Sequence, residues 1–303
     1  MTDAAAPPTV LDAVTALDLR YPREWADSWD RVGLVLGDFG HPVERVLCVV
    51  DCVPETVDEA LDVRADLIVA HHPLLLKPVS SIAPDTYKGR IVHRLIRNDV
   101  ALYVAHTNAD SADPGVSDAL AARLDLRDLR PLVPAAVPGT GAGRVGVLAA
   151  PMTLADFVPF VASRLPVTAA GVRAAGDPAG VIRTMAVCGG AGDGFLADAV
   201  AAGVDAYLCA DLRHHPASEH LAAGGPALID VAHWATERPW LDEVAGWLRG
   251  ELGADVIVSD LDTDPWTVHA FGSLEKPLDP PLENSPLGKP PLENPLENKE
   301  NPS

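Results

Sequence analysis

Two adjacent histidines, His71 and His72, follow an apolar run in the stretch "IVAHHPLL" (68–75). Imidazole is the commonest side-chain ligand of divalent transition metals, and neighbouring side chains on an extended segment point in different directions. The pair therefore suits two ions a short distance apart better than one shared ion. Pro73 then ends the strand and stiffens the backbone. By itself the pair is also consistent with two ordinary polar residues at a strand end.

A histidine and a carboxylate, His106 and Asp110, follow the next apolar run in "VAHTNAD" (104–110). This donor combination is ordinary for Zn²⁺, Mn²⁺ or Fe²⁺, and a carboxylate can also bridge two ions. The alternative is a short polar loop in which Asn108 and Asp110 bond to the backbone. Taken alone, the segment is explained more simply by that turn.

A third pair, His233 and Glu237, lies four residues apart in "DVAHWATERPW" (230–240), at the start of a predicted helix. Side chains at this spacing share one helix face, so the pair could bind neighbouring metals. The alternative is a helix-surface pair whose acid is favoured by the helix dipole in the first turn.

All three segments come at the carboxyl end of a predicted strand, where parallel sheets bind their ligands. Together they supply four histidines and two carboxylates, an inventory that fits a site for two metal ions. Coincidence explains three such segments less well than it explains any one of them.

Two further motifs are weaker. A second "HHP" at 214–216 makes His215 a candidate cavity residue, whereas its histidine neighbours suit a helix surface. The stretch "CGGAGDGF" (188–195) could hold a phosphate on backbone amides, but it lacks the Walker lysine and the full dinucleotide spacing. We therefore interpret it as a tight structural turn.

The segments between these motifs predict an α/β fold with largely parallel strands, because strand-like and helical runs alternate. Near-continuous apolar runs predict strands covered on both faces, at 45–51, 66–72, 101–107, 144–150, 184–190, 206–211 and 227–233. Helical periodicity predicts helices at 54–64, 89–99, 153–164, 193–202, 214–223 and 235–251.

The composition divides the chain into four parts. A first α/β half is expected over 1–125, a Pro- and Gly-rich linker over 126–142, and a second half over 143–272. The remaining 31 residues, 273–303, contain eight prolines and repeat "PLEN" three times. Such a segment buries too little apolar area to fold, so we expect a disordered tail, either native or left from cloning.

Charge and cysteine usage exclude several classes of function. The chain carries 43 acidic and 23 basic residues and a net charge of −20, which argues against binding to nucleic acid. No apolar run approaches the roughly 18 residues of a membrane span, and the N-terminus does not read as a signal peptide. The four cysteines form no CxxC pair, as expected for reduced thiols in a cytoplasmic protein.

The ordered set of motifs resembles the NIF-three-like family, the relatives of NGG-one-interacting factor, many of which are labelled GTP cyclohydrolase I type-two homologues. The similar segments are "SWDRVGLVLGD" (28–38), "IVAHHPLLLKP" (68–78), "YVAHTNADSADPGVSDALA" (103–121), "CGGAGD" (188–193) and "DVAHWATERP" (230–239). The resemblance implies two similar α/β halves that face across a metal-containing cleft, and a hexamer built as a trimer of dimers. It implies two divalent ions per chain, with ligands His71, His72, Asp110, His233 and Glu237. Histidine and carboxylate ligands without cysteine allow Zn, Mn, Fe or Ni.

A metal-dependent hydrolase is the function that this resemblance favours. The substrate would be a small nucleotide-like molecule or a phosphoester, with His106 and His215 as candidate proton carriers. The alternative is a ring-shaped scaffold or regulatory protein that uses its ions for stability alone. Two departures from relatives stand out: Arg31 replaces a common asparagine beside Asp30, and the short 126–142 stretch leaves no room for an inserted middle domain.

Overall fold

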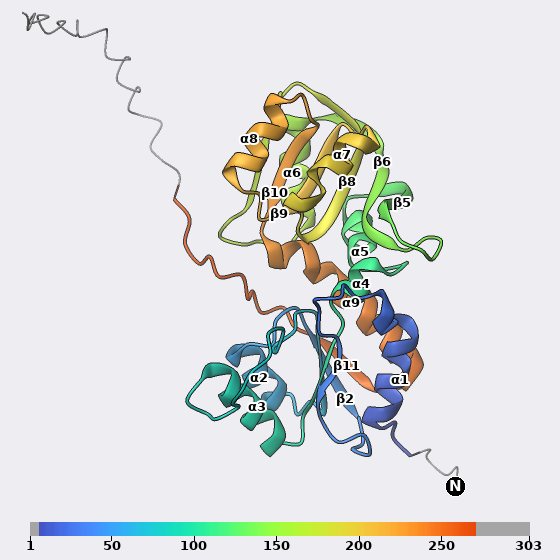
Figure 1. The fold of residues 1–303 in the computed structure, drawn as a ribbon, viewed down its shortest axis with the longest axis vertical. Helices are drawn as coiled ribbons and strands as arrows, with labels where there is room; N and C mark the ends of the chain where they lie inside the picture. Colours follow the sequence, from blue (N-terminus) through green and yellow to red (C-terminus); the bar gives the residue numbers. More distant parts are fainter. Residues whose placement is uncertain (1–5, 271–303) are drawn as a thin grey trace, which may run out of the picture. The chain divides into compact units, whose positions relative to one another are not determined.

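The computed structural model describes residues 6–270, which contain two β-sheets flanked by helices (Figure 1). The predicted tail at 273–303 lies outside the described residues. Of the described residues, 6–268 group as one compact unit. Among the described residues, no helix combines the length and apolarity needed to cross a membrane.

The first sheet has five strands in the order β1-β4-β3-β2-β11. Its strands are β1 (Gly33–Leu36), β2 (Arg45–Val49), β3 (Leu67–Ala70), β4 (Ala101–Val104) and β11 (Asp255–Val258). Strands β4, β3, β2 and β11 are parallel, and β1 pairs with β4 in the antiparallel sense. The predicted parallel core is therefore confirmed, but β11, the last strand among the described residues, completes the first sheet.

Alternating side chains of the first sheet enter two separate cores, which explains why its strands are apolar throughout. Val46, Leu67 and Tyr103 pack with helices α1 (Val10–Arg20) and α9 (His233–Leu252). The opposite face packs against α2 (Pro54–Asp62) and α3 (Tyr87–Arg97), which lie together beside the sheet in Figure 1.

The second sheet has six strands in the order β5-β6-β8-β9-β10-β7. Its strands are β5 (Leu126–Pro134), β6 (Gly141–Thr153), β7 (Val172–Ala175), β8 (Val181–Ala191), β9 (Ala206–Ala210) and β10 (Ala227–Val231). Strands β8, β9 and β10 are parallel, whereas β5, β6 and β7 pair in the antiparallel sense.

Helices cover both faces of the second sheet. α6 (Leu154–Arg164), α5 (Val116–Arg123) and α9 contribute to the core on one face, and α7 (Leu196–Ala202) and α8 (His214–Ala222) pack on the other. The short helix α4 (Thr107–Ser111) precedes α5. The core that α9 shares with α1 and α5 is continuous across both sheets.

The segment 126–142, where the sequence predicts a linker, has regular secondary structure. These residues form β5, a turn and the first residues of β6, joined as an antiparallel pair. β5 is an edge strand with mostly exposed side chains and two prolines, and such a strand lacks the apolar pattern of a central one.

Candidate metal centre

The two adjacent histidines continue the β2–β3 pairing beyond the end of β3. The backbone N–H of His71 donates to Val49 O at 3.1 Å, and that of His72 donates to Val50 O at 2.9 Å. His71 is fully buried and His72 is partly exposed, and their ring centroids lie 4.9 Å apart. The sheet therefore fixes the backbone of both candidate ligands.

Each of four histidines uses its Nδ1 atom for a contact with protein oxygen. The partners are Ala105 O for His71 (2.9 Å), Asp51 Oδ1 for His72 (2.8 Å), Asp30 Oδ1 for His106 (3.0 Å) and Asp211 Oδ2 for His233 (2.7 Å). In a neutral imidazole that donates from Nδ1, the Nε2 atom keeps its lone pair for a metal. The four rings are thus oriented by protein groups outside the centre.

Three of these Nε2 atoms, from His71, His72 and His233, converge on the carboxylate of Glu237. Its oxygens lie 3.4 Å from His71 Nε2, 3.2 Å from His72 Nε2 and 3.0 Å from His233 Nε2. His233 begins α9, so the predicted four-residue spacing places both side chains on one face of the helix. Candidate ligand atoms fall into two groups, each within 4.8 Å: His71–His72–His106 and His72–His233–Glu237.

Asp110 reaches the same centre from α4, where its Oδ1 lies 3.7 Å from His71 Nε2. Residues 107–111, for which a polar loop was the alternative, are helical. Asp110 Oδ1, His71 Nε2 and Glu237 Oε2 are buried and make no hydrogen bond. Unpaired buried polar atoms are costly, and a divalent cation would satisfy all three. The residues present therefore fit a metal centre.

Burial and mutual charge shift the pKa values in this cluster. Burial raises the pKa of Asp110 to about 7, and the nearby Glu237 adds to the shift. Burial also opposes charge on Glu237, but the imidazoles of His72, His71 and His233 outweigh it and hold this pKa well below its usual range. Burial lowers and Glu237 raises the pKa of His233, for a net value of about 10. Metal binding must therefore displace protons from the cluster.

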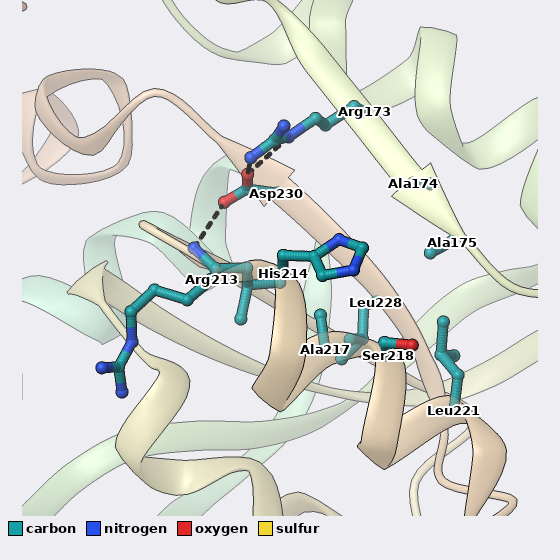
Figure 2. Close-up of a pocket in the computed structure, with 11 residues that line it drawn as sticks. Arg173, Ala174, Ala175, Arg213, His214, Ala217, Ser218, Leu221, Leu228 and Asp230 are labelled. Atoms are coloured by element: carbon teal, nitrogen blue, oxygen red, sulfur yellow. Dashed lines mark hydrogen bonds and ion pairs between the residues drawn. The ribbon is translucent and has the colours of Figure 1, made fainter. Parts of the chain in front are cut away.

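The fold brings together six of the seven predicted site residues, and the exception is His215. This residue is exposed in the first turn of α8, with its ring 5.1 Å from that of His214. A pocket of about 400 Å³ lies between α8, β7 and β10, and its lining includes His214, Ser218 and Leu228 rather than His215 (Figure 2). This pocket shares no residue with the metal centre.

Sequence reasoning missed Asp51 and Asp211, the carboxylates that hold His72 and His233. Asp51 follows β2 closely, and Asp211 directly follows β9. The rule that located the histidines, polar residues at the carboxyl ends of parallel strands, also applies to these two positions.

Replacing Asp51 by asparagine is expected to weaken metal binding by roughly 10- to 100-fold, the usual cost of losing an outer carboxylate partner. The carboxylate holds His72 at 2.8 Å and accepts a 2.5 Å hydrogen bond from Thr263 Oγ1. Titration with a competing chelator measures the change. The matched variant Thr263→Val removes the hydrogen bond to Asp51 but keeps the carboxylate, so its loss of metal affinity should be smaller. Equal metal affinity in the unchanged protein and in both variants would contradict the role of Asp51 in holding His72.

Gly190 approaches the centre so closely that a side chain cannot be added there. A Cβ atom would lie 2.4 Å from Glu237 Oε1 and 3.0 Å from His233 Nε2, and the residue has φ +69°. Gly190→Ala is expected to lower metal content sharply and to cost about 1–2 kcal/mol for the left-handed backbone. Gly203→Ala is the control, because Gly203 has φ +67° with open space around its Cβ position. Gly203→Ala should lose stability but keep its metal content, as measured by thermal unfolding and elemental analysis.

The sequence of this chain is similar to a described protein family and to proteins from other organisms. The family model described as Duf34/NIF3 (NGG1p interacting factor 3) matches residues 8–265. A Streptomyces coelicolor protein named GTP cyclohydrolase 1 type 2 homolog is 53% identical, over 86% of this chain and 95% of that protein. The NIF3-like protein 1 of Drosophila melanogaster is 32% identical, over 80% of this chain and 84% of that protein.

Solved structures give the same result for the fold. A Bacillus cereus protein related to NIF3 superposes with a TM-score of 0.82 at 25% identity, over 88% of this chain and all of that one. A Staphylococcus aureus hypothetical protein superposes with a TM-score of 0.78 at 29% identity, over 87% of this chain and all of its own.

Proposed function

Because this chain belongs to the Duf34/NIF3 family, we propose that it binds two divalent metal ions and hydrolyses a small nucleotide-like substrate. The observation that carries the proposal is that three buried candidate ligand atoms without a hydrogen bond, from His71, Asp110 and Glu237, converge with the ligand group His72–His233–Glu237. Imidazole and carboxylate ligands without cysteine suit Zn²⁺, Mn²⁺, Fe²⁺ or Ni²⁺. The name of these relatives, GTP cyclohydrolase 1 type 2 homolog, supports guanine nucleotides as the substrate class.

In this proposal each residue has a distinct task. His71, His72, Asp110, His233 and Glu237 hold the ions, which when bound lower the pKa of water and polarise a substrate oxygen. His106, held at Nδ1 by Asp30, presents Nε2 to the centre. It takes a proton from the attacking water and returns it to the leaving group as the substrate bond breaks.

The first experiment is elemental analysis of protein purified without nickel affinity chromatography. Two ions of Zn, Mn, Fe or Ni per chain are expected, and the metal-loaded protein is then assayed with GTP and other nucleotides by chromatography of the products. His106→Asn should abolish turnover, whereas His215→Asn should leave it unchanged because His215 is exposed on α8.

Less than one ion per chain would contradict the metal centre. Two ions without turnover of any nucleotide would contradict the hydrolase and favour the scaffold alternative. The hexamer stays a prediction of the family resemblance, which light scattering on a sizing column measures directly. We also propose a reducing, cytoplasmic location, because all four cysteines are free and buried.

A further inference from the structure

The segment Asp27–Arg31 is fixed to the metal centre on both sides of Trp29. The backbone N–H of Asp27 donates to Thr107 Oγ1 at 2.9 Å. Asp30 Oδ2 accepts hydrogen bonds from Thr107 Oγ1 at 2.6 Å and Thr107 N at 3.1 Å. Because these bonds flank Trp29, its backbone is tied to the start of α4, one residue after His106.

Trp29 presents a large aromatic surface at this position. The residue is 53% exposed, yet its ring lies 5.9 Å from that of His106 at an angle of 80°. The His106 ring in turn lies 5.1 Å from that of His71 and 5.4 Å from that of His72. Single exposed hydrophobic residues are ordinary on a surface. An anchored tryptophan in contact with a candidate metal-centre histidine is a rigid platform, since little entropy is lost when a ring stacks on it.

Arg31 adds a positive charge beside this platform. The residue is exposed, and its Nη1 atom donates to Asp30 O, which directs the guanidinium along the same segment. The guanidinium group binds phosphate and carboxylate through parallel hydrogen bonds. Because the chain has a net charge of −20, the positive charge of Arg31 beside Trp29 favours an anionic substrate that the rest of the surface repels.

We propose that Trp29 and Arg31 form the recognition edge of the site, where Trp29 stacks on the planar ring of the substrate and Arg31 binds its anionic group. The inference rests on the proposed function and narrows it to molecules that carry a flat heteroaromatic ring and a phosphate. Neither residue is a metal ligand in this proposal. Their replacement should therefore change binding without changing metal content.

The test compares binding of GMP and guanosine to the metal-loaded protein, by calorimetry and by quenching of tryptophan fluorescence. Trp29→Ala should weaken binding of both molecules by about 5- to 150-fold, the range for loss of one stacked base. Trp29→Phe should recover most of the affinity, because it keeps a ring. Arg31→Gln should weaken binding of GMP and leave that of guanosine unchanged.

Phe39→Ala is the matched control. Phe39 is 51% exposed in the turn between β1 and β2, where its carbonyl oxygen accepts a hydrogen bond from Leu11 N at 3.0 Å. This variant should bind GMP as the unchanged protein does. Metal content is measured in every variant and should stay constant.

Unchanged GMP affinity in Trp29→Ala, or no binding of GMP by the unchanged protein, would overturn the recognition edge. Its failure can be told apart from failure of the hydrolase. Turnover with an unaltered KM in Trp29→Ala would contradict the recognition edge and support the hydrolase. GMP binding that depends on Trp29, in a protein without turnover, would support the recognition edge and contradict the hydrolase.

Discussion

Glu237→Gln is expected to release most of the bound metal while the chain stays folded. The carboxylate is buried at 3% exposure and lies within 3.4 Å of three imidazole Nε2 atoms, so its negative charge is shared by the whole cluster. Glutamine keeps the shape and removes the charge. The loss of affinity should exceed the roughly 10- to 100-fold that removal of an outer partner costs.

Elemental analysis after dialysis measures this effect, and circular dichroism checks the fold. Metal addition should raise the melting temperature of the unchanged protein but not that of the variant, because only binding to the folded state stabilises it. Glu243→Gln is the matched control, since Glu243 lies exposed on the same helix. Two ions retained in Glu237→Gln would show that this residue is not a ligand.

Arg144→Met is expected to lower the free energy of unfolding by about 3–5 kcal/mol, more than any other substitution named here, because it leaves a buried ion pair without its cation. The Arg144 side chain is 2% exposed and donates to Asp118 Oδ1 at 2.7 Å. It also donates to the carbonyl oxygens of Gly141, Gly143 and Ala112. Methionine fills much of the volume but satisfies none of these acceptors.

Denaturant unfolding measures the change in the free energy of unfolding. Arg164→Met supplies the comparison, because Arg164 pairs with Asp125 at the surface, where both side chains are about half exposed. That variant should lose no more than about 1 kcal/mol. Equal losses in the two variants would contradict a special role for burial. Ala112 lies two residues after Asp110, so the Arg144 variant should also bind metal less tightly.

The sequence predicted central strands and missed edge strands, for a physical reason. β2, β3 and β4 are covered on both faces, which requires an apolar residue at nearly every position and makes the pattern visible. β5 lies at an edge with exposed side chains, so its composition resembles a loop. β11 has four residues after a long helix, and only its pairing with β2 identifies it.

The clustering of the candidate ligands was predictable because they follow strand ends or share one helix turn, and both relations are local in sequence. Arg144 was not predictable. It begins the apolar run "RVGVLAA", and two of its four acceptor residues, Asp118 and Ala112, are brought to it only by the tertiary structure. The exposure of Trp29 was not predictable either, because a tryptophan in a polar segment can equally be buried by a distant element.

The return of β11 to the first sheet has a consequence for synthesis of the chain. A ribosome releases β2 about two hundred residues before β11, so the edge of β2 that β11 will cover stays open during most of translation. Unpaired strand edges are templates for association with other chains. The nascent protein therefore exposes this edge until β11 is made, and β11 both covers the edge and secures α9, which carries two of the candidate ligands.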